Sequence, residues 1–152
     1  MNFTISKAML NEIPEINKML TDLIQDERNN YDSNINENYK VQEFYEKLID
    51  SDNKIILVAR DNDTILGYVY GFIQDNGNLF NNKIAKLDAL FVKEQYRGNG
   101  IARSLIREFI NWARENKVAY IELSVCKDNT NAINLYKNEG FNIDKICLKK
   151  KL

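Results

Sequence analysis

The stretch VKEQYRGNGIARSLI, from Val92 to Ile106, changes character partway along its length. Apolar residues typical of a strand end at Val92, and an apolar helical rhythm begins near Ile101. Gly98 and Gly100 lie between the two, where the lack of a side chain allows a tight turn and a close approach of the backbone to a ligand. The stretch therefore predicts a strand that passes through a glycine turn into a helix.

A helix entered in this way has unpaired N–H groups in its first turn, which together carry about half a positive charge. Such a helix start suits a phosphate, and Arg97 and Arg103 add cationic donors beside the glycines. A tight turn that binds no ligand explains the glycines as well. The sequence thus indicates a pyrophosphate cradle, with a purely structural turn as the alternative.

Two familiar phosphate loops fit this stretch poorly. A Walker A motif ends in Gly-Lys-Ser/Thr, whereas Gly100 is followed by Ile101 and Ala102. A dinucleotide fingerprint needs a small residue at the position of Arg103, and it normally opens a longer domain than the remaining residues could form. A nucleotide-binding protein that uses the same loop differently stays a minor alternative.

Composition sets the broad class. A chain of 152 residues with 44% hydrophobic content can bury one core, so we expect a single domain over residues 1–152. The 21 basic and 22 acidic residues nearly balance, so we expect neither a nucleic acid nor a membrane as partner. No signal-peptide pattern opens the chain, and we expect a cytoplasmic protein.

The chain contains no histidine, which excludes serine–histidine and cysteine–histidine nucleophiles and most zinc sites. We therefore expect no metal, and any chemistry must use carboxylates, tyrosines, lysines, thiols or the backbone. Cys126 and Cys147 lie in strand-like stretches without the spacing of a metal or disulfide pair. They are predicted to be reduced, small core residues.

Periodicity and turn residues predict the other elements. In order, these are a strand at 3–7, a helix from about 13, a polar loop at 25–38, a second helix at 41–49, three strands up to Val92, a helix up to 116, a strand at 118–126, a helix at 129–138 and a strand at 145–151. The helix that follows Val92 is a crossover, so the strands before and after it should be parallel within a mostly antiparallel sheet.

The stretch QYRGNGIA (95–102) resembles the acetyl-CoA-binding motif of the GNAT superfamily of N-acetyltransferases. A second stretch, NTNAINLYKNEGF (129–141), matches the family pattern Asn-x-x-Ala-x-x-x-Tyr-x-x-x-Gly-Phe. The two motifs stand in the family's order, separated by a helix and a strand. The order of elements from Phe3 onward is also similar, so the resemblance covers nearly the whole chain.

The resemblance implies a mixed α/β (α+β) fold. In that fold a mostly antiparallel sheet of six to seven strands contains a central, splayed parallel pair and is flanked by about four helices. The pantetheine arm of acetyl-CoA fills the gap between the splayed strands and pairs with the exposed backbone of the first, much as another strand would. Acetyl-CoA is accordingly the implied acetyl donor.

The resemblance also implies which residues bind this donor. They are the backbone groups of Leu90, Phe91 and Val92, the loop residues Gln95, Tyr96, Arg97, Gly98, Asn99, Gly100, Ile101, Ala102 and Arg103, and the later residues Asn129 and Tyr136.

Acetyl transfer needs a neutral amine, and deprotonating an alkylamine at pH 7 costs about 4 kcal/mol. The resemblance implies that Tyr136 protonates the departing thiolate; a tyrosine that packs the helix onto the sheet is the alternative. It implies Asp88 as general base, with a structural bridge to Lys86 as the alternative. Glu122 is the second candidate base, and an ordered water chain is the third. A related subgroup, the ribosomal-protein N-terminal acetyltransferases, has its glutamate where this chain has Ser124.

The implied activity is direct transfer of acetyl to a primary amine, without a covalent enzyme intermediate. The acceptor could be a small amine, a polyamine or a peptide amine, bound near residues 25–38 and the second helix. A non-catalytic acyl-CoA-binding sensor is the alternative. Few residues follow Gly140, so another subunit could complete the last strand, which makes a homodimer possible.

Overall fold

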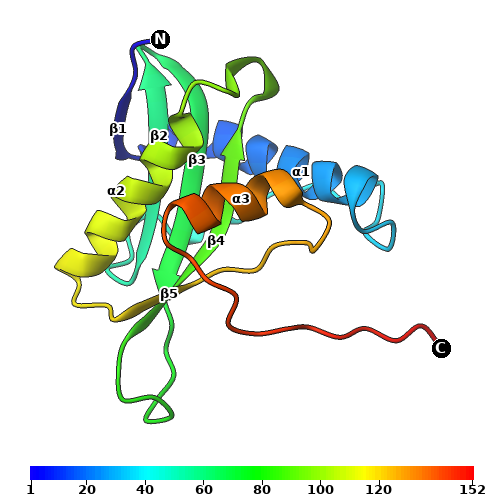
Figure 1. The fold of residues 1–152 in the computed structure, drawn as a ribbon. Coiled ribbons are helices and arrows are strands. Elements are labelled where there is room, and N and C mark those ends of the chain that lie inside the picture. The colour runs from blue at the N-terminus through cyan, green and yellow to red at the C-terminus, as the bar shows by residue number, and fades with distance from the viewer.

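The computed structural model describes residues 1–152 and is built around a five-stranded sheet with the strands in sequence order (Figure 1). The strands are β1 (Thr4–Lys7), β2 (Lys54–Asp61), β3 (Thr64–Ile73), β4 (Ile84–Val92) and β5 (Tyr120–Glu122), and the helices are α1 (Ile13–Asn30), α2 (Ile101–Glu115) and α3 (Thr130–Asn138). The first four strands are antiparallel, and β4 and β5 are parallel. No helix is both long enough and apolar enough to cross a membrane.

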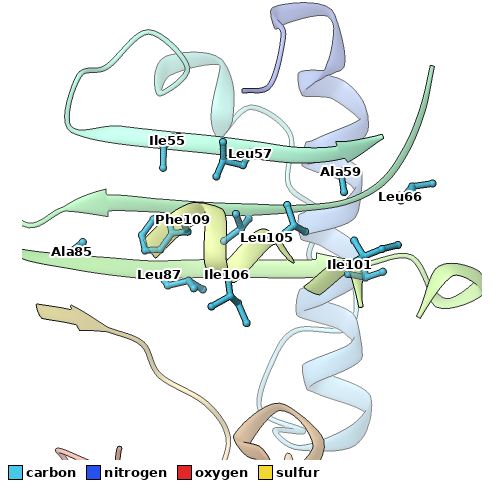
Figure 2. Close-up of a cluster of buried hydrophobic side chains, with 12 residues drawn as sticks. Ile55, Leu57, Ala59, Leu66, Ala85, Leu87, Ile101, Leu105, Ile106 and Phe109 are labelled. Carbon is cyan, nitrogen blue, oxygen red and sulfur yellow. The ribbon is translucent and has the colours of Figure 1, made fainter. Parts of the chain in front are cut away.

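One face of the sheet is covered by α2. Its apolar residues Ile101, Leu105, Ile106 and Phe109 are at most 1% exposed and pack against β2, β3 and β4 (Figure 2). The helix is amphipathic, so burying this row leaves its charged residues in solvent. This packing fixes the start of α2 at the end of β4.

The opposite face is covered by α1. Its residues Ile13, Ile16 and Met19 are buried against the sheet in a second core. Tyr45 reaches the same core from the segment that follows α1, and its hydroxyl lies 3.1 Å from that of Tyr68 on β3. The sheet therefore lies between α1 on one side and α2 and α3 on the other (Figure 1).

Gly71 allows α2 to touch the backbone of β3. A Cβ atom at this position would lie 2.3 Å from the Phe109 ring and 2.4 Å from the backbone oxygen of Lys86. Any larger residue would push the helix away from the sheet.

A β-bulge interrupts β4 at Asp88. Tyr70 pairs with Ala89 and the next residue, Gly71, pairs with Leu87, so Asp88 has no partner on β3. The extra residue changes which side chains face each core: Leu87 belongs to the α2 side and Ala89 to the α1 side. The bulge thus bends β4 next to the gap that opens on its other edge.

The parallel pair β4 and β5 is joined over only three residue pairs. The last of them is Lys86 with Glu122, and β4 continues to Val92 without a partner on that edge. The predicted splayed parallel pair is confirmed.

The helix content differs from the prediction at two places. The predicted second helix at 41–49 is wrong, because only Tyr45–Lys47 form a single 3-10 turn. Side chains of α1 supply the hydrogen bonds that a helix would have made: Val41 N donates to Thr21 Oγ1 over 3.0 Å, and Asn17 binds both Gln42 O and Tyr45 N over 3.4 Å. The predicted polar loop from residue 25 is also wrong in part, since α1 runs on to Asn30.

The strand count is lower than predicted. The strand expected at 118–126 shortens to Tyr120–Glu122, because beyond this point the chain has left β4 and has no partner. The strand expected at 145–151 is wrong: residues 142–152 make no backbone–backbone hydrogen bond. Cys147 lies on this segment and is exposed, so its predicted place in the core is also wrong.

Candidate active site

A cavity of about 730 Å³ lies beside the gap where β4 and β5 separate. Its walls come from the second half of α1, the unpaired part of β4, the loop before α2, residues 124–126 and α3. The predicted residues Leu90, Phe91 and Val92 line this cavity along the free edge of β4. Their backbone is therefore next to the space in which an extended ligand could pair with it.

The start of α2 lies at one end of the cavity. Gly98 and Gly100 have φ values of 79° and 77°, a left-handed backbone that L-residues avoid. A Cβ atom added to either glycine would meet no protein atom within 4 Å. Because both line the cavity, the bare backbone here borders open space, as a backbone that binds a phosphate must. Tyr96, Ile101 and Ala102 complete this end of the wall.

Both predicted arginines line the cavity and are held by other groups. The Arg97 guanidinium donates to Val92 O over 2.9 Å and lies 3.1 Å from the Asp26 carboxylate. It also lies 5.5 Å from the centroid of the Phe91 ring. Arg103 pairs with Glu139 over 3.1 Å. A bound phosphate would therefore share these guanidinium groups with carboxylates.

Two predicted loop residues lie outside the cavity wall. The Asn99 side chain donates to Tyr96 O over 3.0 Å and to Arg97 O over 3.2 Å, so it supports the turn. Gln95 belongs to the 3-10 turn Glu94–Tyr96 and does not line the cavity.

Tyr136 and Asn129 reach the cavity from α3. Burial raises the pKa of Tyr136 to about 12, and the negative charge of Glu27 adds to this shift. The hydroxyl is therefore protonated at neutral pH and available as a donor. The Asn129 carboxamide caps α3 by accepting a hydrogen bond from Ala132 N over 3.2 Å.

Asp88 lines the cavity at the bulge in β4. Its side chain makes no ion pair and remains exposed to solvent, and the partial loss of water around the carboxylate raises its pKa above the usual aspartate value. Its charge reaches the tyrosines on the α1 side of the sheet: burial, and then Asp88, raise the pKa of Tyr70 to about 12. A carboxyl group with a raised pKa in a cavity is suited to accept a proton.

Glu122 is a poorer proton acceptor. It forms ion pairs with Lys86 and, over 3.2 Å, with Lys145. The hydrogen bond from Lys86 is the main cause that lowers its pKa. Lys86 is thus bound to Glu122, and the bridge between Asp88 and Lys86 that was the structural alternative does not form.

Cys126 lines the cavity but is a poor nucleophile. Burial and the nearby carboxylates of Glu27, Asp32 and Asp128 raise the pKa of its thiol. A neutral thiol reacts slowly, which argues against a covalent acyl-enzyme at this residue.

The acceptor was expected near residues 25–38, but the sequence analysis did not predict that α1 itself forms this wall of the cavity. Leu23, Asp26, Glu27 and Tyr31 line the cavity, although residues from 25 onward were interpreted as a loop. A signal was present in the spacing, since positions 23, 27 and 31 follow one another at four-residue intervals along one side of a helix, although Glu27 is charged.

Comparison with known proteins is consistent with this geometry. Residues 18–141 match the model of a family described as "Acetyltransferase (GNAT) family". An uncharacterized N-acetyltransferase of Dictyostelium discoideum is 41% identical over 59 residues, or 39% of this chain. One of Methanocaldococcus jannaschii is 32% identical over 94 residues, or 56% of this chain. The chain spans 27% and 42% of the length of these two relatives.

The fold is also found in solved structures. A crystal structure of a mutant protein from Bacillus halodurans superposes with a TM-score of 0.87 and covers 98% of this chain and 99% of that one. The sequence identity is 20%, so the likeness concerns the fold alone.

Proposed function

Because the chain belongs to the acetyltransferase (GNAT) family, we propose that it transfers the acetyl group of acetyl-CoA to a primary amine. The observation that carries this proposal is the gap between β4 and β5, which leaves the edge of residues 87–92 that faces β5 without a strand partner beside a cavity. An extended pantetheine arm can bind such an edge through main-chain hydrogen bonds.

The two ends of the cavity suit the two ends of acetyl-CoA. Gly98 and Gly100 leave the N–H groups at the start of α2 open to a pyrophosphate. Tyr136 and Asp88, the titratable groups proposed for the reaction, lie in the other walls. Acetyl-CoA, when bound, supplies the activated acyl group, and the protein positions it and handles the protons.

The proposed proton transfers use two groups with raised pKa values. Asp88 accepts a proton from the incoming ammonium, directly or through water, which offsets part of the cost of about 4 kcal/mol for making the amine neutral at pH 7. Tyr136 donates its phenolic proton to the thiolate that leaves, and the second proton that the nitrogen loses as the amide forms restores the phenol. The attack is direct, because Cys126 is a neutral thiol.

The test is release of free thiol from acetyl-CoA with a panel of polyamines, aminoglycosides, amino acids and peptide amines. Thiol release that depends on an amine, with the acetylated amine found by mass spectrometry, supports the proposal. Binding of acetyl-CoA without turnover across the panel would instead identify an acyl-CoA-binding sensor. Preferential binding of NAD or ATP would identify a nucleotide-binding protein.

We also propose that the chain forms a homodimer through residues 142–152. Ile146 and Leu148 on this segment are 81% and 91% exposed, and its backbone groups have no protein partner. A strand edge of a second copy would satisfy both. Light scattering after gel filtration tests this: Ile146→Lys combined with Leu148→Lys should convert a dimer to a monomer.

We also propose that the protein is located in the reducing cytoplasm, which suits the two cysteines because both are free thiols.

A further inference from the structure

We propose that Glu27 recognises the positive charge of the acceptor, an aliphatic ammonium group, and holds it on the side of the cavity opposite Tyr136. This inference rests on the proposed acetyl transfer for its role in the reaction. The binding of the cation by Glu27 can be tested without that reaction.

Glu27 enters the cavity from the face of the sheet opposite α3. Helix α1 lies behind the sheet in Figure 1 and α3 lies in front of it, while residues of both line the same cavity. Glu27 is close enough to Tyr136 and Cys126 for its charge to raise the pKa of both side chains. Glu27 and Tyr136 thus line one cavity from opposite faces of the sheet, within the range of each other's charge.

The position of Glu27 is fixed by the end of α1. Its backbone oxygen accepts hydrogen bonds from Tyr31 N over 2.8 Å and from Asp32 N over 2.9 Å, which closes the last turn of the helix. Leu23, one turn earlier, and Tyr31, one turn later, line the cavity with it. The side chain therefore projects from a rigid element.

Glu27 lacks an ion partner although most of its charged neighbours have one. Asp26 pairs with Arg97, Arg28 with Glu37, and Asp32 with Lys149. The Glu27 carboxylate forms no ion pair and no hydrogen bond, and the causes of its raised pKa are burial and the charge of Asp32. A half-buried carboxylate of this kind is stabilised by any cation that enters the cavity.

The helix adds to this preference. Glu27 lies in the last turn of α1, where the dipole places partial negative charge and where acidic residues are unfavourable. Burial, the repulsion from Asp32 and the helix dipole all oppose a negative charge here. A bound ammonium ion offsets this cost by its attraction to the carboxylate. Arg97 and Arg103 line the other end of the cavity but are engaged by Asp26 and Glu139.

These features select a class of acceptor. An alkylamine arrives as an ammonium ion at neutral pH and can bind Glu27 before Asp88 takes its proton. An arylamine arrives uncharged and gains nothing from the carboxylate. Glu27 is therefore inferred to be a specificity-determining residue that makes the site prefer an aliphatic amine to an aromatic one.

The first experiment is a calorimetric titration of butane-1,4-diamine into the full chain, with Glu27→Gln as the variant. We expect Glu27→Gln to weaken binding of the diamine roughly tenfold, and Glu27→Asp to restore part of it. Asp22→Asn is the matched control, because Asp22 lies on α1 but outside this cavity and has no ion partner. Equal affinity of the wild type and Glu27→Gln overturns the inference.

The second readout is the pKa of Tyr136, followed by NMR of ¹³Cζ-labelled tyrosine. Glu27→Gln should lower this pKa in the absence of any ligand, because one of the causes that raise it is removed. An unchanged pKa would show that the two groups are too far apart to share a substrate. A lowered pKa with unchanged diamine affinity would also overturn the inference, since the groups would then be close without recognising the cation.

The kinetic readout separates this inference from the proposed function. In the thiol-release assay Glu27→Gln should raise the KM of an alkylamine roughly tenfold, leave the KM of acetyl-CoA unchanged and have little effect on an arylamine. A wild type that releases no thiol with any amine contradicts the proposed function, whereas the titrations still decide whether Glu27 binds the cation.

Discussion

Lys86 on β4 and Glu122 on β5 form both the last residue pair of the parallel ladder and an ion pair at the closed end of the gap. Beyond them the two strands separate, and Leu90, Phe91 and Val92 line the cavity along the edge of β4 that has lost its partner. The Asp88 bulge is two residues after Lys86. The structure thus combines a closed ladder, a bulge and an open edge within five residues of one strand.

Replacing Tyr136 with phenylalanine tests its role as proton donor. The raised pKa of about 12 keeps the hydroxyl protonated over the working pH range, so its removal should lower kcat about 100-fold. The affinity for CoA, measured by calorimetry, should stay nearly unchanged, because the ring still packs against Phe141. A matching loss of affinity and rate would show that Tyr136 acts only in packing.

Asp88→Asn tests the general base. The partial loss of water around the carboxylate raises the pKa of Asp88, so in the wild type kcat/KM should rise with pH through a value above the usual aspartate range. The variant should lose this step and be about 100-fold slower at pH 7. A pH profile that keeps the step in Asp88→Asn would assign the base to another group.

Gly100→Ala tests the phosphate cradle, with Gly77→Ala as a matched control. Both glycines have a left-handed backbone and room for a Cβ, so each substitution should destabilise the fold by about 1 kcal/mol. Only Gly100 lines the cavity, so only Gly100→Ala should also weaken CoA binding. Comparable CoA affinities for the two variants would argue against a phosphate at this helix start.

The buried ion pair between Glu12 and Arg60 makes stability depend on pH. The hydrogen bond from Arg60, with a distance of 2.6 Å from Nε to the carboxylate, is the main cause that lowers the pKa of Glu12. A lowered pKa means that this contribution is complete above the unfolded value of 4.5 and disappears as the pH falls through the folded value.

Glu12→Gln should therefore reduce the free energy of unfolding by roughly 2 kcal/mol at pH 7 and by progressively less below pH 4.5. Urea denaturation of both proteins from pH 7 to pH 3 measures this difference. A difference that is constant over this range would mean that the charge of Glu12 contributes nothing.

The elements around the glycine turn were predictable because local chemistry decides them. Gly98 and Gly100 require a left-handed turn, and the apolar row from Ile101 to Phe109 can bury itself only as a helix. The parallel pairing of the neighbouring strands then follows from the crossover. The parallel pairing of β4 and β5 and the glycine turn at the start of α2 could therefore be predicted from the sequence.

Features that depend on distant partners were not predictable. The segment after α1 forms no helix because Asn17 and Thr21 satisfy its backbone. The extent of β5 depends on where the chain leaves β4, which no local pattern encodes. Residues 25–38 were expected near the acceptor, but the place of Glu27 on a helix was not predicted, because a polar run was interpreted as a loop although α1 continues through it.

The most direct test of the central claim follows the backbone amide signals of the protein by NMR while CoA is added. We predict large shifts for residues 90–92 on the free edge of β4 and for Gly98 to Ile101 at the start of α2, with little change in β1 and β2. Shifts confined to other parts of the sheet, or no shifts at all, would contradict binding of the cofactor between the separated strands.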